Sequence, residues 1–249
     1  MYCTALNGTR VNSAGESYCE TVFKYDARGN IIEQTVLDKN GKPARDSEMA
    51  YKRIKKYDDC KHCIYEKNLA PDGQPVHGGQ LSPELTITYD DHGNITSLVY
   101  LDGYGKPYTG PDGFHKQERR YNKDNLLESE CFRDVNGYLA THRTRQFAKI
   151  NLTYDSKRHV IKEKYFAASG KMMYYTTLKY NGQGSNIDIS LYNAEGQLDD
   201  TVKGFSRMTT TYMSDGVTPI KRSYYRDGKV AASQDFFSTI GRWGDLEHL

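Results

Sequence analysis

The chain has 249 residues, and its 34 basic and 32 acidic side chains leave a formal charge of +2, which excludes a strong general attraction to nucleic acid or anionic membranes. Only 37% of the residues are hydrophobic and the mean hydropathy is −0.79, which is lean for a compact globule with a deep core. No stretch approaches the roughly 18 apolar residues of a membrane span. The 21 tyrosines partly compensate, because each buries a large ring while keeping its hydroxyl in water.

Seven tyrosines mark a repeat, and each is followed sixteen residues later by a glycine. The pairs are Tyr25/Gly41, Tyr57/Gly73, Tyr89/Gly105, Tyr121/Gly137, Tyr154/Gly170, Tyr180/Gly196 and Tyr212/Gly228. The offset is constant although successive tyrosines lie 32, 32, 32, 33, 26 and 32 residues apart. This pattern predicts one array domain over residues 1–249, with a partial unit at 1–24, repeats that start at the seven tyrosines, and a C-terminal cap at 233–249.

Each repeat carries two turn signals, as in Asp26–Gly29 and Asp38–Gly41 of the first one. The fourth position after the tyrosine is Gly or Asn in five of the seven repeats, and these residues adopt a left-handed backbone at little cost. A type I turn closed by a glycine bulge fits both signals. Between turns, apolar residues recur with a period of two, and no helical period is sustained.

These elements predict an all-β fold. We expect an antiparallel up-and-down meander of about fifteen strands, with one β-hairpin per repeat, in a twisted or spiralling sheet. One or two short helices are expected near residues 235–243.

Five repeats carry an insertion of about six residues after the second turn: 45–50, 77–82, 109–114, 141–146 and 200–205. Insertions at one register of an array project from one edge, which is often the binding edge. The alternative is that they are bulges that bend the sheet or cover one face. Because the inserts differ in sequence while the strands repeat, we expect a contact surface formed by His77, Tyr108, Phe114, His142 and Arg143.

The motif Tyr-Asp-x-x-Gly-Asn, present at Tyr25–Asn30 and Tyr89–Asn94, resembles the YD repeats of bacterial Rhs and eukaryotic teneurin proteins. The resemblance implies β-hairpins that coil into a spiralling sheet, and a bacterial protein with a role at the cell surface or in secretion. The 32-residue spacing is longer than in that family, the repeats are too few for a closed shell, and no Asp-Pro-x-Gly motif is present. The encapsulating function of the family is therefore not carried over.

The sharpest local anomaly is Cys60-Lys61-His62-Cys63, which occupies the first turn of the second repeat and places Lys61 where a glycine is expected. It is interpreted as a plain turn with free thiols or a local disulfide, as half of a disulfide to a neighbouring segment, or as a zinc site with Cys60, His62 and Cys63 as ligands. A structural zinc site needs about four ligands, and no second cluster is present. The chain has five cysteines, so at least one is free or pairs outside this set.

No nucleophile triad, phosphate loop or metalloprotease motif is present. The sequence therefore favours a non-enzymatic repeat module that presents a binding surface to a protein or another surface partner, without a cofactor. Two alternatives are a carbohydrate-binding module with exposed tyrosines and, less favoured, a hydrolase with acids on the inserts. The repeat tyrosines form either a structural ladder or an exposed platform. Residues 1–24 contain no signal-peptide core, and the location stays open, with a secreted or cell-surface protein favoured.

Overall fold

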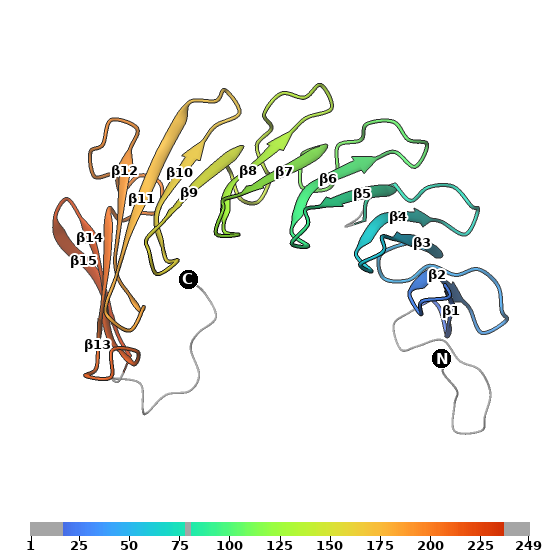
Figure 1. The fold of residues 1–249 in the computed structure, drawn as a ribbon, viewed down its shortest axis with the longest axis horizontal. Coiled ribbons are helices and arrows are strands. Elements are labelled where there is room, and N and C mark those ends of the chain that lie inside the picture. Colours follow the sequence, from blue (N-terminus) through green and yellow to red (C-terminus); the bar gives the residue numbers. More distant parts are fainter. Residues whose placement is uncertain (1–16, 78–80, 237–249) are drawn as a thin grey trace. The chain divides into compact units, whose positions relative to one another are not determined.

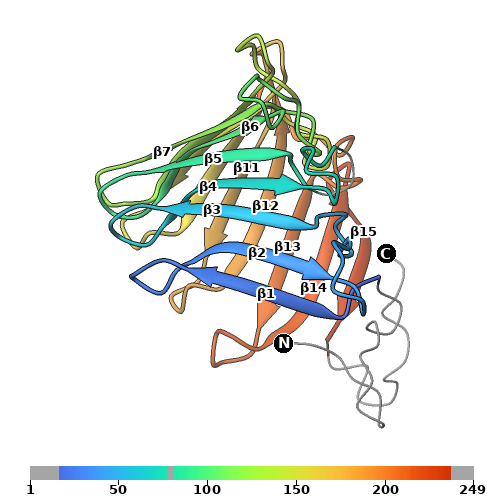
Figure 2. The same ribbon diagram turned by 90° about the vertical axis from the view of Figure 1, so that its right-hand side faces the viewer.

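The computed structural model describes residues 17–77 and 81–236 of the chain. All regular structure in this part is β-strand, and fifteen strands follow one another in hydrogen-bonded order, each antiparallel to the next (Figures 1 and 2). The predicted up-and-down meander is confirmed. The strands are β1 Glu20–Tyr25, β2 Ile31–Leu37, β3 Lys52–Tyr57, β4 Cys63–Leu69, β5 Glu84–Tyr89, β6 Ile95–Leu101, β7 Lys116–Tyr121, β8 Leu127–Arg133, β9 Lys149–Tyr154, β10 Val160–Phe166, β11 Met172–Tyr180, β12 Asn186–Asn193, β13 Arg207–Tyr212, β14 Pro219–Arg226 and β15 Lys229–Asp235.

The contacts divide the chain into two compact parts. The first part comprises the residues up to Arg120 together with Glu130–Ala148, and the second comprises Tyr121–Ser129 and the residues from Lys149 onward. The prediction of a single array domain is not tested by this division. The helices expected near residues 235–243 lie outside the described residues, except that Asp235 is the last residue of β15.

The first turn of each repeat forms as predicted. After β1, the Asp26 carboxylate accepts the backbone N–H groups of Arg28 and Asn30 at 2.9 and 2.8 Å, and the strand register shifts between Lys24 and Tyr25, which is the expected bulge. Lys61 and Arg158 adopt the same left-handed backbone as the glycines that they replace, with φ of 68° and 72°. The fourth residue after the tyrosine has positive φ in all seven repeats: Gly29, Lys61, Gly93, Asn125, Arg158, Gly184 and Gly216.

The second turn has the same geometry. In the first repeat, Asp38 Oδ1 accepts the backbone N–H groups of Asn40 and Lys42 at 2.8 and 2.9 Å, and Gly41 has φ of 75°. All seven glycines at the sixteenth position have positive φ. In the first six repeats the constant tyrosine-to-glycine offset is therefore the length of one strand enclosed by two similar turns, whereas the last repeat closes with a two-residue turn at Asp227 and Gly228, both with positive φ.

The repeat tyrosines join neighbouring repeats. The Tyr57 hydroxyl donates to the carbonyl of Ile31, which is the sixth residue after Tyr25, at 3.0 Å. The same bond recurs at 2.8–3.0 Å from Tyr89 to Cys63, Tyr154 to Leu127, Tyr180 to Val160 and Tyr212 to Asn186. Tyr25, in the first described hairpin, is 57% exposed. The tyrosines therefore form a structural ladder of hydrogen bonds between repeats.

The inserts bury the small core. After its second turn the first repeat makes an isolated bridge, Leu37 to Pro43, and β3 starts only after the insert. Val36 contacts both segments, because its N–H donates to the Tyr51 carbonyl and its carbonyl accepts the Ala44 N–H. The residues at this position in the other long repeats make the same pair of bonds: Asn68, Tyr100, Phe132 and Leu191.

Phe132 is fully buried, and Val36, Asn68 and Leu191 are each 2% exposed. In the one short repeat between described turns, the same span is the uninterrupted nine-residue strand β11. The inserts thus split a strand in two and cover the core residue between its halves.

Candidate binding surface

Three of the four inserts of the first compact part bring the five predicted contact residues into two groups. The ring of His77 meets the ring of Tyr108 edge-on, with 5.8 Å between their centroids. The ring of Phe114 lies 5.5 Å from that of His142, and the Arg143 N–H donates to the Asp112 carbonyl at 2.8 Å. Neighbouring inserts are therefore in direct contact with one another.

Tyr100 connects the two groups from below. Its ring lies 5.3 Å from the ring of Phe114, and its carbonyl accepts the N–H of Tyr108. Burial raises the pKa of the Tyr100 hydroxyl to about 12, and nearby Asp112 adds to this shift. Tyr100 is therefore neutral at physiological pH and serves as packing.

Exposure separates the five residues. His77 and Arg143 are exposed, and Tyr108 and His142 are half-buried. Phe114 is only 3% exposed, and its ring packs against Phe132 at 4.9 Å. In this structure Phe114 supports the surface from beneath, and the other four side chains reach solvent.

The His142 side chain holds its own insert in shape. Its Nδ1 accepts the backbone N–H groups of Thr144 and Arg145 at 3.3 and 3.4 Å. Burial lowers the pKa of His142; Asp112 opposes this shift, whereas Arg145 adds to it. His142 is consequently neutral near pH 7, with the proton on Nε2.

A buried carboxylate anchors the same insert. Glu130 on β8 is 2% exposed and accepts hydrogen bonds from Gln117 at 2.6 Å and from Arg119 at 2.9 Å. Arg145 of the insert forms an ion pair with the second oxygen of Glu130, and its guanidinium lies 4.6 Å from the centroid of the Phe147 ring. The loop that carries His142 and Arg143 is therefore fixed to the sheet beneath it.

Arginines anchor two other inserts as well. Arg53, which is 8% exposed, pairs with Asp46 and Glu48 of the first insert, each at 2.5 Å. In the second compact part, Arg226 donates to the Gly204 carbonyl of the last insert at 2.7 Å. Loops that are held in this way lose little conformational entropy on binding, which favours recognition.

Two exposed tyrosines next to these inserts were not predicted as contacts. Tyr104 and Tyr138 lie at the second turns of the third and fourth repeats and are 66% and 73% exposed. Tyr104 is held by a 2.6 Å hydrogen bond from its hydroxyl to Gln74. The turn requires no aromatic side chain at either position. An aromatic residue there was therefore the sequence feature that could have indicated a contact role.

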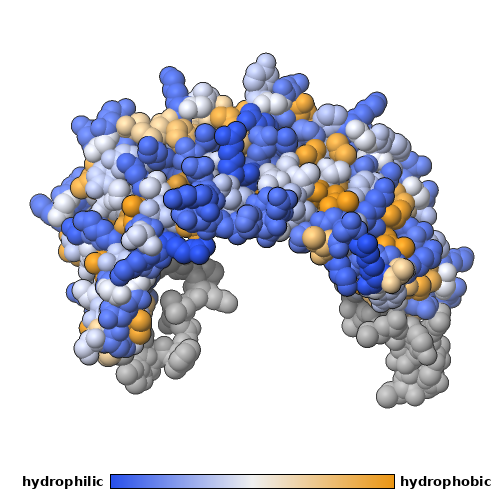
Figure 3. Space-filling model, viewed as in Figure 1, coloured by the Kyte–Doolittle hydropathy of each residue, from blue (hydrophilic) through white to orange (hydrophobic). Residues whose placement is uncertain are grey.

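Hydrophilic residues dominate the face drawn in Figure 3, and the hydrophobic ones form small groups. Some strongly exposed large apolar side chains belong to β1, β11 or the last repeat. The others lie in or beside second turns or in inserts: Met49, Tyr104, Val135, Tyr138, Leu198 and Val202. Exposed aromatic side chains set among polar ones are typical of recognition surfaces.

The cysteine–histidine turn is built like its counterparts. His62 Nδ1 lies 3.0 Å from Asp58 Oδ2, where the first repeat has an Asn30–Asp26 bond, and the His62 ring stacks on Tyr89 with 4.6 Å between centroids. Cys60 is an exposed free thiol and Cys63 a half-buried one, and burial raises the pKa of Cys63. Within residues 17–77 and 81–236, no three His, Cys, Asp or Glu side chains are grouped so that they could hold a metal.

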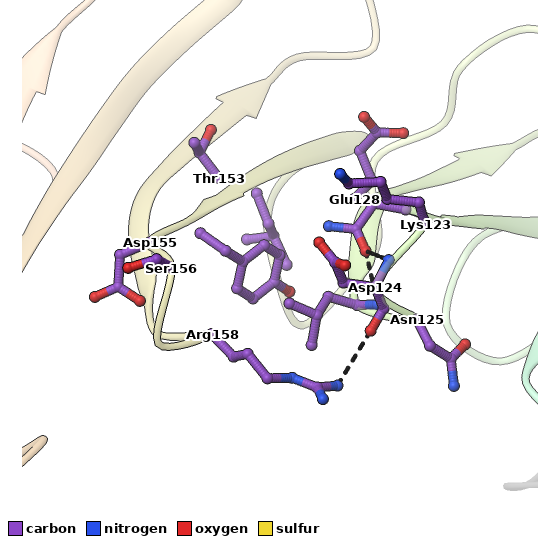
Figure 4. Close-up of a pocket in the computed structure, with 12 residues that line it drawn as sticks. Lys123, Asp124, Asn125, Glu128, Thr153, Asp155, Ser156 and Arg158 are labelled. Atoms are coloured by element: carbon purple, nitrogen blue, oxygen red, sulfur yellow. Dashed lines mark hydrogen bonds between the residues drawn. The ribbon is translucent and has the colours of Figure 1, made fainter.

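Shallow grooves lie where the first turns of neighbouring repeats meet. One groove in the second compact part, of about 780 Å³, is lined by residues 122–126, Glu128, residues 152–156 and Arg158. Arg158 crosses it and donates to the Asp124 carbonyl at 3.2 Å (Figure 4). A second groove, of about 670 Å³, lies between the first turns of the second and third repeats.

Comparisons with known proteins give similarity only to solved structures. No protein-family model and no curated protein matches the sequence. A crystal structure of TcdB2–TccC3 without its hypervariable C-terminal region aligns over 91% of this chain, with a TM-score of 0.40 and 14% identity. The Tc holotoxin pore of Photorhabdus luminescens aligns over 90%, with a TM-score of 0.38 and 15% identity.

This chain spans 11% of the length of each of those chains. Similarity at this level assigns neither a family nor an activity. In the described residues, no helix is long and apolar enough to cross a membrane.

Proposed function

We propose that this chain is a non-enzymatic repeat module that presents its insert loops to a protein partner. The contact surface, called the insert surface below, comprises His77, Tyr104, Tyr108, Tyr138, His142 and Arg143. The observation that carries the proposal is that exposed aromatic and basic side chains gather on neighbouring turns and inserts, and that the insert with His142 and Arg143 is anchored by the ion pair of Arg145 with buried Glu130. Recognition surfaces are enriched in Tyr and Arg, and rigid loops reduce the entropy lost on binding.

Four of the six histidines in the described part support a structural rather than a catalytic role. His62 and His159 each pair with the aspartate of their own turn at 3.0 Å and stack on the next repeat's tyrosine. His142 accepts two backbone N–H groups, and His115 Nδ1 lies 2.8 Å from the Tyr100 carbonyl. Through these contacts, all four imidazole rings stabilise turns or inserts.

The proposal is tested by screening the chain against arrays of purified proteins and of glycans, and then by measuring affinity for each protein that binds. Tyr108→Ala, Tyr138→Ala and Arg143→Ala should each weaken binding by more than about 1 kcal/mol, with unchanged thermal unfolding. Tyr25→Ala is the matched control, because it removes an exposed aromatic ring away from the inserts. If the three variants bind normally and Tyr25→Ala does not, the insert surface is not the binding site.

A further inference from the structure

The two shallow grooves described above, called the Tyr89 groove and the Tyr154 groove after a tyrosine in each lining, occupy equivalent positions in the repeat. Each has one wall from the residues that follow a repeat tyrosine and the other from the end of the next repeat's first strand and its turn. The next tyrosine, Tyr89 in one groove and Tyr154 in the other, lies in the lining, and its hydroxyl is bonded to the preceding repeat. The groove is thus a product of repeat stacking, and only its side chains differ from one junction to another.

In the Tyr89 groove, the side chains of Asp58, His62, Thr88 and Asp90 are bonded within the protein. Asp58 bonds to His62, and the ring of His62 covers Tyr89. Thr88 Oγ1 lies 2.9 Å from the hydroxyl of Thr96, and Asp90 accepts from Asn94. This groove offers few hydrogen-bonding groups to a ligand.

The Tyr154 groove differs at the same positions. Leu126 stands where His62 stands in the other groove, and Glu128 replaces Ile64. Thr153 is equivalent to Thr88, which is bonded to Thr96. Among the described residues, no hydrogen bond or ion pair engages the side chains of Lys123, Glu128, Thr153 or Ser156. In Figure 4, Glu128 and Thr153 stand on opposite walls with Arg158 across the lower end.

The chemistry of this lining selects a ligand class. Two cationic residues, Lys123 and Arg158, face three carboxylates, Asp124, Glu128 and Asp155, so the formal charge is −1 and a polyanion is disfavoured. Hydroxyl, ammonium and carboxylate groups provide both donors and acceptors, and Leu126, Leu152 and the Tyr154 ring add apolar area. A neutral pyranose ring has this combination of several hydroxyls and an apolar C–H face.

We propose that the Tyr154 groove is a binding site for a sugar residue of a neutral oligosaccharide. Its volume of about 780 Å³ lies within the range of roughly 300–1,000 Å³ for small-ligand sites. The site is separate from the insert surface and does not depend on the function proposed above.

The test uses the full chain and three neutral probes, chitohexaose, cellohexaose and maltohexaose, with a heparin hexasaccharide as the charged comparison. We expect at least one neutral probe to shift the amide NMR signals of residues 122–128 and 152–158. The double variant Glu128→Ala/Thr153→Val should weaken that binding at least tenfold. Thr88→Val, the same change in the Tyr89 groove, should leave the affinity unchanged, as should Arg143→Ala on the insert surface.

Thermal unfolding of each variant shows whether a loss of binding comes from a loss of fold. The proposal is overturned if no neutral hexasaccharide shifts these signals, or if only heparin does. It is also overturned if Thr88→Val weakens binding as much as the double variant.

Discussion

In addition to strand pairing, a tyrosine hydroxyl joins a repeat to the one before it at five junctions. The tyrosine ring could be replaced by another large side chain, but the bond to the carbonyl six residues after the preceding tyrosine requires the phenol. A hydrogen bond of this kind contributes about 1 kcal/mol net to stability. The chemistry explains why the tyrosine is constant while the residues around it vary.

Replacing Tyr57, Tyr89 or Tyr180 by Phe should therefore lower the free energy of unfolding by about 1 kcal/mol each, measured by chemical denaturation. The losses should add for separate junctions, because each repeat contacts only its neighbours. Tyr25→Phe is the control and should have little effect, since the Tyr25 side chain is 57% exposed. A loss at Tyr25 equal to the others would show that the ring, and not the bond, is responsible.

Two turn glycines that differ in φ allow the cost of a left-handed backbone to be measured. Gly41 has φ of 75° and Gly182 does not have positive φ, while a Cβ atom at either position would meet no atom within 4 Å. Gly41→Ala should destabilise by about 1 kcal/mol through backbone strain alone. Gly182→Ala should be neutral or slightly stabilising, because it reduces the entropy of the unfolded chain. Equal effects in thermal unfolding would contradict this explanation.

Because burial lowers the pKa of His142, the free energy of unfolding should depend on pH. Burial lowers its pKa in the folded state below the ordinary value of 6.5, so the unfolded chain binds more protons in the window just below 6.5. The contribution of His142 is fully present above pH 6.5 and is lost as the pH falls through the folded-state pKa. His142→Asn, which keeps an acceptor for the loop N–H groups, should lose less stability than the parent between pH 7.5 and 5. Parallel denaturation curves for the two proteins would be the contrary result.

At the scale of elements, the insert is the unit that creates a core. Without it, a repeat is a plain hairpin with a long strand such as β11; with it, residues such as Phe132 and Ala148 become fully buried. In the fourth repeat, the insert is anchored to the strand beneath it, because Arg145 reaches the buried Glu130. Its exposed residues therefore depend on a contact made below them.

Removing that contact should loosen the insert. Arg145→Met leaves one oxygen of a buried carboxylate without its ion pair, which should cost about 2 kcal/mol, and it should speed proteolysis within residues 141–146. In the Glu130→Gln background the same substitution should cost much less, which a double-mutant cycle measures. An unchanged cost in that background would mean that Arg145 acts through the phenyl rings alone.

The sequence predicts structure well where local turn chemistry determines the backbone conformation. It predicts structure poorly where packing determines which side chains are buried. The positions of Gly29 and Gly41 were sufficient to place two turns per repeat, and Lys61 and Arg158 take the left-handed conformation because their neighbours impose it. That Phe114 is buried could not be derived, because an aromatic residue at an insert end fits a surface as well as a core. Tyr104 and Tyr138 were missed because a turn tolerates any side chain at their positions.

The whole molecule is an array of strands that pair only with their sequence neighbours. Within the described residues, such an array has an edge at its last strand, and edge strands tend to pair with other chains. β15 is exposed along its whole length and pairs with β14 through residues that include Ser233 and Asp235. Deleting residues 233–249 should therefore promote aggregation or fraying of the last repeat, seen by light scattering and hydrogen exchange. A truncated chain as soluble and cooperative as the parent would show that these residues are dispensable.

The central claim is that recognition uses the insert surface on a rigid repeat scaffold. Amide hydrogen exchange, measured on the free chain and on its complex with a protein found in the array screen, tests it most directly. We predict slower exchange in residues 104–114 and 138–146 on binding, and no change in the first turns at residues 26–30 and 90–94. Protection confined to the first turns or to the strands, with the inserts unchanged, would contradict the claim.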